Sequence, residues 1–415
     1  MGLPDVVCFS QLRWDFVFQR PQHLMSRAAR TRRVFYVEEP RLTTRRVAYL
    51  RQRMSPDGVL VCTPYLPRIT HESAPPAIAA LVRDILDAER VRRPVVWYST
   101  PMAEPIGREI DAACRVYDCM DDLAGFRHAS RRIHEHETRL LATADLVFTG
   151  GQSLYEAKSA LHPRVHAFPS AVDVRHFARA RLSPPEPPDL NDVPRPRLCF
   201  VGVIDERIDL DLVVATADAR PGWHVVMIGP TAKISRRQLP VRPNVHYLGK
   251  KDYDSLPDYL AHVDAGIMPF AINRATRYIS PTKTPEYLAA GLPVISTPIA
   301  DVVRGYGERG FVAIASGVDA FVAACEVAIS EPRDEAEARR RRADELLARI
   351  SWDATWARMD RLILRAVADR AVERAETAGR RSDADALRTS SSPTSGVRRD
   401  SHAALRPTAA TRVAE

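Results

Sequence analysis

The segment SPTKTPEYLAAGLPVI, residues 280–295, decides the fold. Its pattern indicates a loop, a short helix, a glycine stop and a buried strand. Thr284 suits the N-cap and Pro285 the first helical position, where the N–H that proline lacks would have no partner. Gly291 suits the left-handed residue that ends a helix. A helix N-terminus is therefore expected at the end of a sheet, where free amides and the helix dipole favour an anion.

Two charged side chains flank this helix start. Lys283 can add a positive charge to a bound diphosphate, and Glu286 in the first turn can accept hydrogen bonds from two vicinal hydroxyls of a ribose. A purely structural interpretation stays open, in which Lys283 is exposed and Glu286 caps the helix. The combined spacing Lys-x-x-Glu-Tyr-x-x-x-Gly-x-Pro-Val favours the binding interpretation.

Around this segment the second half of the chain alternates short apolar runs with helical stretches. Strands followed by crossover helices predict a doubly wound α/β domain, which we place at residues 197–350. The expected strands are residues 197–203, 224–228, 245–247, 265–268, 293–296 and 311–314. The expected helices are residues 209–219, 256–262, 285–290, 318–330 and 334–350.

The first half, residues 1–181, shows the same alternation and predicts a second Rossmann-like domain. Its expected strands are residues 5–10, 34–38, 59–64, 94–99, 115–119 and 145–149, and its expected helices are residues 16–30, 76–90, 104–113, 130–142 and 153–160. Two such α/β domains face each other across a cleft at the carboxyl ends of their strands, where sheets of this kind bind ligands.

Composition shifts mark the remaining boundaries. Residues 182–196 hold six prolines in fifteen positions, which predicts a linker. Ser351 suits the N-cap of a C-terminal helix over residues 351–369, with Trp352, Trp356 and Met359 on one face. Residues 370–415 are poor in large apolar side chains and predict a disordered tail. Acidic residues throughout that tail argue against nucleic-acid binding.

The signature resembles the donor site of GT-B glycosyltransferases, most closely the bacterial family 4-like group that includes teichuronic acid biosynthesis enzymes. The resemblance covers residues 5–365. Within that range, residues 11–24 and 117–122 also look typical of the group. It implies that Glu286 holds the nucleotide ribose, that basic residues meet the diphosphate and that the anomeric configuration is retained. Many family 4 enzymes carry a second Glu eight positions earlier, where this chain has Tyr278.

Other second-half residues fit the same cleft. Gly202 follows a strand and permits close backbone approach to a phosphate that Arg207 could reach, although a packing role for Gly202 is an equal alternative. Lys283 and Arg207 are expected to stabilise the departing diphosphate. The complete set of donor-binding candidates is Gly202, Gly229, Leu248, Ser280, Thr282, Thr284, Lys283 and Glu286.

The first half supplies the acceptor candidates. Trp14 offers a flat face for a sugar ring, and Arg13, Asp15 and Gln19 offer polar contacts. Asp121 follows a buried strand and could act as general base or orient the acceptor. Asp122 could contact the acceptor or cap the following turn.

Charge and cysteine content bound the setting of the protein. The 415 residues carry a net charge of +8, and residues 27–53 hold nine arginines against two acids. That stretch predicts contact with an anionic membrane, although an exposed loop is an equal alternative. The six cysteines lack metal-ligand spacing and predict buried thiols of a cytoplasmic protein. No signal peptide or membrane span is expected.

These observations predict a cytoplasmic glycosyltransferase that moves a sugar from a nucleotide diphosphate to a glycan or lipid-linked acceptor in cell-envelope polysaccharide synthesis. No cofactor beyond the nucleotide sugar is expected, and no metal, because no Asp-x-Asp flanked by apolar strands appears in the donor half. A nucleotide-sugar epimerase and a non-catalytic nucleotide-sugar-binding protein stay open as alternatives. An oxidoreductase is disfavoured, since no Gly-x-Gly-x-x-Gly opens either half.

Overall fold

The computed structural model describes residues 2–70, 72–127 and 129–390. Its first lobe is built on a nine-stranded sheet in the order β3-β5-β2-β1-β6-β7-β8-β9, with β4 paired to β5. Every pairing is parallel except that of β4 with β5. The strands are β1 (Val6–Phe9), β2 (Val34–Val37), β3 (Arg41–Leu42), β4 (Tyr49–Met54), β5 (Val59–Leu66), β6 (Val95–Tyr98), β7 (Cys114–Cys119), β8 (Leu146–Thr149) and β9 (Val165–Ala167).

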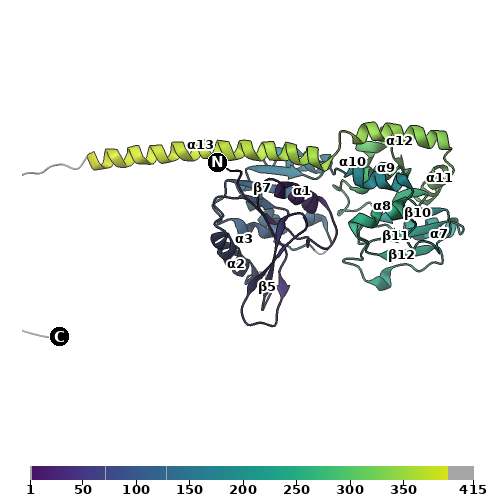
Figure 1. Ribbon diagram of the computed structural model, residues 1–415, viewed down its shortest axis with the longest axis horizontal. Helices are drawn as coiled ribbons and strands as arrows, with labels where there is room; N and C mark the ends of the chain where they lie inside the picture. Colours follow the sequence, from purple (N-terminus) through teal and green to yellow (C-terminus); the bar gives the residue numbers. More distant parts are fainter. Residues whose placement is uncertain (1, 71, 128, 391–415) are drawn as a thin grey trace, which may run out of the picture. The chain divides into compact units, whose positions relative to one another are not determined.

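Alternating side chains of each central strand serve the two faces of this sheet. In β1, Val6 and Cys8 join one core cluster while Val7 and Phe9 join the other. Both faces are therefore buried, which explains why the strands are continuous apolar runs. The helices of this lobe, coloured purple to blue in Figure 1, are α1 (Arg20–Ala29), α2 (Ala74–Ala88), α3 (Glu104–Gly107), α4 (Ile133–Thr143) and α5 (Gln152–Lys158).

The second lobe contains a six-stranded, wholly parallel sheet in the order β12-β11-β10-β13-β14-β15. Its strands are β10 (Arg197–Val201), β11 (His224–Ile228), β12 (Val245–Gly249), β13 (Ala265–Met268), β14 (Val294–Ser296) and β15 (Ala313–Ile314). Its helices, in teal and green in Figure 1, are α6 (Val174–Ala178), α7 (Leu210–Ala219), α8 (Leu256–Leu260), α9 (Lys283–Ala290), α10 (Ala300–Val302), α11 (Val318–Ile329) and α12 (Arg333–Leu347). The prediction of two doubly wound domains is confirmed.

The predicted linker is placed too late in the chain. Ala171 belongs to the core of the first lobe and Val172 to that of the second, so the chain crosses there and not at residues 182–196. The proline-rich segment instead lies against the second lobe, because it contributes the buried side chains of Leu190 and Val193. Proline prevents regular structure but does not prevent packing.

The C-terminal helix α13 (Trp352–Ser390) returns to the first lobe. Trp352, Trp356 and Met359 pack in the core cluster that also holds Leu24 and Met25 of α1. The predicted apolar face is therefore correct. The disordered tail predicted from residue 370 is wrong for residues 370–390, which continue the helix; residues 391–415 lie outside the described residues.

The structure corrects two further predictions, one for the basic segment and one for the helix expected at residues 104–113. The basic segment around residues 41–53 forms β3 and β4 on the edge of the first sheet, where Arg41 and Arg51 are exposed. The helix expected at residues 104–113 ends at Gly107, where the ring of Tyr98 and the side chain of Phe9 leave no space for a Cβ atom.

The remaining expectations concern cysteines and membrane spans. All six cysteines are buried free thiols, as predicted. Within the described ranges, the helices lack the combination of length and apolar character that crossing a bilayer requires.

Candidate functional site

A pocket of about 370 Å³ lies between the two lobes. The first lobe lines it with residues 14–19, which connect β1 to α1. The second lobe contributes the residues after β10, β11 and β12 and the start of α9. Parallel strands place their carboxyl ends at one edge, so these loops meet where α/β sheets bind ligands.

Helix α9 begins two residues earlier than predicted. The N-cap is Thr282 and Lys283 is the first helical residue, while Gly291 ends the helix in the left-handed conformation with φ of 87°, as predicted. Thr284 is 0% exposed, and its hydroxyl donates to Met268 Sδ at 3.4 Å. The predicted capping and donor-binding roles of Thr284 are therefore wrong, because its side chain points into the core.

Tyr287 fixes this helix to the sheet. Its hydroxyl accepts a hydrogen bond from Val201 N at 2.7 Å, and its side chain is 0% exposed. A Cβ atom at Gly266 of β13 would lie 2.5 Å from the Tyr287 ring, so glycine is required for this packing. The tyrosine of the signature thus holds the start of α9 at the ends of β10 and β13.

Lys283 and Glu286 both line the interlobe pocket. The Lys283 ammonium contacts the hydroxyl of Thr282 at 3.1 Å. Glu286 is only 7% exposed, and among the described residues its carboxylate has no hydrogen-bond or ion-pair partner. A nearly buried charge without a protein partner is unfavourable. The pair therefore fits a ligand that brings an anion to Lys283 and hydroxyl donors to Glu286.

Two glycines let the backbone approach Lys283 closely. Gly202 has φ of 155°, and a Cβ atom there would lie 2.9 Å from Lys283 Cε. Gly229 has φ of 147°, and its Cβ would lie 1.8 Å from the carbonyl oxygen of Gly202. Both positions accept only glycine, and both line the pocket as predicted.

A smaller pocket of about 100 Å³ continues from the first and shares Gln19, Gly202 and Lys283 with it. It adds Asp121 and Arg207, together with the predicted donor contacts Ser280 and Thr282. The structure thus brings all three predicted catalytic side chains, Asp121, Lys283 and Arg207, to one place.

The charges of this smaller pocket differ in their partners. Arg207 donates to Asp205 through Nε at 3.0 Å and Nη2 at 2.8 Å, so its charge is already balanced. Burial raises the pKa of the Asp121 carboxyl, although the nearby Arg207 guanidinium opposes that shift. A carboxyl with a raised pKa is a better proton acceptor than an ordinary aspartate.

A buried ion pair behind this pocket was not predicted. Arg20 Nη2 lies 2.7 Å from Asp118 Oδ1, and Asp118 is 0% exposed. Arg20 Nη1 also donates to the carbonyl of Phe168 at 2.7 Å. An aspartate inside the apolar run of β7 was the available signal, because such a charge requires a partner.

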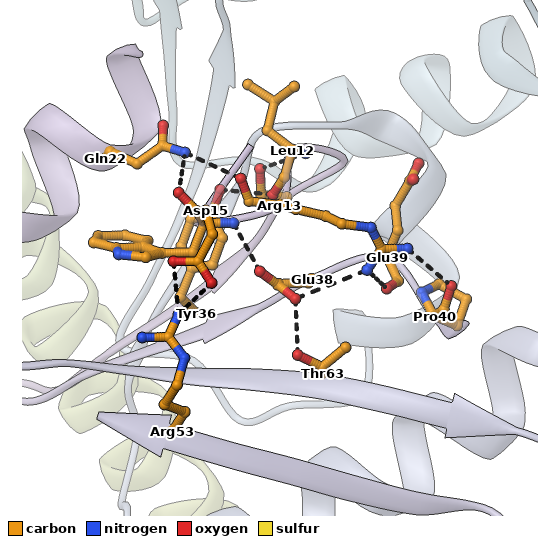
Figure 2. Close-up of polar contacts among 12 residues, drawn as sticks. Leu12, Arg13, Asp15, Gln22, Tyr36, Glu38, Glu39, Pro40, Arg53 and Thr63 are labelled. Atoms are coloured by element: carbon orange, nitrogen blue, oxygen red, sulfur yellow. Dashed lines mark hydrogen bonds and ion pairs between the residues drawn. The ribbon is translucent and has the colours of Figure 1, made fainter. Parts of the chain in front are cut away.

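The predicted acceptor loop is held by a glutamate that sequence reasoning missed. Glu38 accepts from Trp14 N and from Thr63 Oγ1, each at 2.7 Å, and lies 3.8 Å from Arg13 Nη1. Figure 2 shows Glu38 between Arg13 and Thr63, with Arg53 reaching Asp15. These contacts fix the loop at the mouth of the pocket, where Asp15 and Gln19 line it.

Trp14 and Leu248 do not offer the ligand contacts that were predicted for them. The Trp14 side chain is 6% exposed and packs edge-on against Tyr36 at 4.9 Å between ring centroids, so it offers no open face to a sugar. Leu248 is half-buried against the core of the second lobe and lies outside the pocket. Asp122 stands at the N-cap position of the short turn Leu123–Gly125, but its side chain makes no capping hydrogen bond there, and the turn is closed by its carbonyl, which accepts from Gly125 N at 2.9 Å.

Lys250 and Tyr253 replace Leu248 in the lining of the interlobe pocket. Lys250 Nζ donates to the carbonyl of Asp15 across the two lobes at 2.7 Å. Tyr253 stacks on His176 at 4.2 Å and faces Phe18 of the first lobe at 4.8 Å. Lysines and aromatic residues in loops carry no positional signal in a single sequence, which explains why Lys250 was missed.

Residues 195–331 match the sequence profile of the family described as Glycosyl transferases group 1. One relative is TuaH of Bacillus subtilis (strain 168), which is assigned as a glycosyltransferase of teichuronic acid biosynthesis. The two sequences are 27% identical over 260 residues, or 58% of this chain and 64% of that protein. The chain therefore spans less than two thirds of the length of that relative.

Solved structures share the architecture over most of the chain. Sucrose-phosphate synthase from Thermosynechococcus elongatus has a TM-score of 0.65 at 15% identity and covers 88% of this chain and 100% of its own. A UDP-forming α,α-trehalose-phosphate synthase from Burkholderia xenovorans has a TM-score of 0.65 at 11% identity over 87% and 100%. A glycosyltransferase from Rickettsia africae has a TM-score of 0.61 at 11% identity over 88% and 99%. The predicted fold is confirmed.

Proposed function

We propose that this chain, whose residues 195–331 are a glycosyltransferase group 1 domain within a GT-B fold, transfers a sugar from a nucleotide diphosphate to a glycan or lipid-linked acceptor. The observation that carries the proposal is that Lys283 and Glu286 line one interlobe pocket and that neither has an ion-pair partner among the described residues. The family match and the relative TuaH support a role in cell-envelope polysaccharide synthesis.

The donor occupies the second lobe. Its diphosphate meets the Lys283 ammonium and the N-terminus of α9, and the close backbone approach at Gly202 and Gly229 leaves room for it. The ribose hydroxyls donate to the Glu286 carboxylate. Glu286 is buried and Lys283 is half-buried, which strengthens these interactions because less water competes for them.

In the reaction, the bond between the anomeric carbon and the diphosphate oxygen breaks as the acceptor oxygen bonds to that carbon. The acceptor proton passes to Asp121, whose raised pKa suits it to accept a proton. The negative charge that develops on the departing diphosphate is stabilised by Lys283, with Arg207 alongside.

We further propose that configuration is retained and that no divalent metal is needed. Retention is the outcome that the family resemblance implies, and it requires the acceptor oxygen to bond to the anomeric carbon on the face that the diphosphate leaves. Asp121 lines the same small pocket as Lys283 and Arg207. Metal independence is supported by the cations that the protein itself supplies there. NMR of the product anomeric proton tests the first statement, and unchanged rates in EDTA test the second.

The central experiment compares Lys283→Gln with Arg342→Gln, which removes an exposed cation of α12 outside both pockets, in an assay of nucleotide release. Removing an electrostatic contact to the leaving group should lower kcat by about 10²–10³-fold in the first variant and leave the second unchanged. Equal rates in the two variants would refute the proposed site.

The same assay separates the rival functions. An epimerase would consume the donor without any acceptor present. A non-catalytic binding protein would bind the donor in calorimetry but release no nucleotide.

We also propose that the protein is cytoplasmic and rests on an anionic membrane surface through the basic edge formed by β3 and β4. Leu42, Val47 and Met54 are exposed there beside Arg45 and Arg46. Arginine near an anionic surface is worth about 1 kcal/mol per residue. Co-sedimentation with vesicles should therefore require anionic lipid and weaken for Arg45→Glu with Arg46→Glu.

A further inference from the structure

The first lobe contains a second, larger cavity of about 810 Å³. It opens at the carboxyl ends of β1, β2 and β6 and runs between α2 and α4. A volume of this size is ample for a drug-sized ligand or a short amphiphile, since such sites commonly measure 300–1,000 Å³. None of the residues assigned to the donor above line it.

Apolar side chains dominate the lining of this cavity. They come from β1, α2, the segment Pro101–Gly107 and α4, and include Phe9, Ile78, Met102, Ile106 and Ile133. Ile69 at the entrance is 40% exposed. A sugar would leave its hydroxyls without partners against such walls, whereas a hydrocarbon chain would gain by leaving water.

Basic and acidic side chains lie on separate walls of the cavity. Three cations lie on the wall formed by α3 and α4, which contact each other: Arg108 follows α3, Arg132 precedes α4, and Arg139 lies within α4, where it pairs with Glu135. Neither Arg108 nor Arg132 has a side-chain ion pair among the described residues. The acids Glu38, Glu39 and Glu72 come instead from the end of β2 and the loop before α2. One wall is therefore suited to an anion.

A buried histidine on the basic wall also lacks a partner. His136 of α4 is 9% exposed and lines the cavity. Its Nδ1 lies 3.8 Å from Glu104 Oε2, and neither atom has a hydrogen-bond partner. A polar group left unsatisfied at the edge of an apolar cavity points to a ligand that brings a polar end to it.

The cavity also lies next to the proposed reaction centre. Leu123 lines it, and Leu123 N donates to the carbonyl of Asp121 at 3.0 Å. Ser10 and Gln11, which also line it, precede the loop that borders the interlobe pocket. A molecule held here by its apolar end would present its other end toward Asp121.

We infer that this cavity binds the hydrocarbon chain of a phosphate-bearing lipid acceptor, with the phosphate on the basic wall formed by Arg108, Arg132 and Arg139. The inference rests on the proposed transferase function and names its acceptor class. The acceptor sugar, attached through that phosphate, then extends from the basic wall toward Asp121 and the donor.

The test measures binding of butyl, hexyl and octyl phosphate to the full chain by calorimetry, with inorganic phosphate and octyl glucoside as comparison ligands. Each added methylene should tighten Kd about 4-fold while the cavity has room. Octyl glucoside should bind more weakly than octyl phosphate. Equal affinity across the chain lengths, or octyl glucoside binding as tightly as octyl phosphate, would overturn the assignment.

Matched variants locate the site without endangering the fold. Ile69→Asp should weaken octyl phosphate at least 10-fold, whereas Leu161→Asp, at an exposed leucine outside the cavity, should not. Arg132→Glu should likewise weaken it relative to Arg131→Glu, the neighbouring exposed arginine outside the lining. No difference within either pair would place the lipid elsewhere and contradict the inference.

Nucleotide binding in the same samples separates this inference from the proposed function. If the four variants bind the nucleotide normally while alkyl phosphates fail to discriminate between them, only the acceptor inference fails. If no nucleotide sugar binds the wild-type chain while alkyl phosphates show the expected chain-length series, the donor assignment fails and the lipid site stands.

Discussion

The two lobes share one architecture, but the charges packed inside the first lobe differ from those at the start of α9 in the second. In the first lobe, Arg20 is paired with Asp118 and Glu38 is engaged by Trp14 N and Thr63. In the second lobe, Arg207 is paired with Asp205, whereas Lys283 and Glu286 line the interlobe pocket with no ion pair among the described residues. Paired charges fix the shape of the scaffold, and unpaired charges leave the start of α9 ready for a charged ligand. The partner of a charge, more than its presence, separates scaffold from site.

The largest loss of stability is expected for a substitution of Asp118. Replacing it by Ala leaves the Arg20 guanidinium buried without its countercharge, which should lower the free energy of unfolding by about 3–5 kcal/mol. Urea denaturation measures the loss. The double variant Arg20→Met with Asp118→Leu should recover much of it, and a double variant as unstable as the single one would contradict a scaffold role for this pair.

Asp121→Asn should lower kcat by about 10²-fold or more, because the proposed general base is lost. The free energy of unfolding of this variant should, in contrast, be higher than that of the wild type at neutral pH. Burial raises the pKa of this carboxyl, so the folded chain binds the proton more tightly than the unfolded chain.

The contribution of this carboxyl to stability, measured as the difference between the wild type and the asparagine variant, should accordingly fall as pH rises from the unfolded pKa of about 3.9 through the higher folded value. Above that window the asparagine variant should be the more stable, and below it the two should be equal. Urea titrations at pH 3.5 and pH 8 provide the measurement. A variant that is less stable than wild type at pH 8 would contradict the direction of the shift.

Glu286→Gln tests whether an unpaired charge of the second lobe serves ligand binding and not stability. Hydrogen bonds to a charged group contribute about 1.5–3 kcal/mol, so nucleotide affinity should fall roughly 10–100-fold while unfolding is unchanged or slightly harder. Calorimetry and urea denaturation of the same sample give both values. A large loss of stability would place Glu286 among the structural charges.

The smallest effect is expected at Asp15, which pairs with Arg53 on the exposed rim. Both side chains meet water, with 74% and 40% exposure, so Asp15→Asn should change stability by less than about 0.5 kcal/mol. Thermal unfolding at low and high salt measures it. An effect close to that of Asp118→Ala would remove the distinction between rim and interior.

Apolar patterning predicts most of the fold. Every strand expected from an apolar run occurs, because both sheets are buried on two faces and their central strands are mostly apolar. The edge strands β3 and β4 escape this pattern, since an arginine-rich edge has one solvated side. The docking of α13 on the first lobe also escapes it, because periodicity identifies an apolar face but not its partner.

Some residues of the candidate site could likewise be predicted from the sequence, and others could not. Spacing identifies Lys283, Glu286 and Gly291, because helix termini impose local rules. The burial of Trp14 and Thr284 could not be predicted, because each depends on side chains brought together by the fold. Glu38 and Asp118 were missed for the same reason: their partners Thr63 and Arg20 are distant in the sequence.

The chain passes between the lobes twice, at residues 171–172 and again beside Ser351, and Val172 pairs with Ser351 in a parallel bridge. Two adjacent segments connected in this way form a pivot with a preferred axis, whereas a single tether would permit free twisting. Opening of the cleft should therefore follow an arc about that axis, with a few backbone torsions on either side absorbing the movement. Each opening and closing would then return Lys283 and Asp121 to the same mutual alignment.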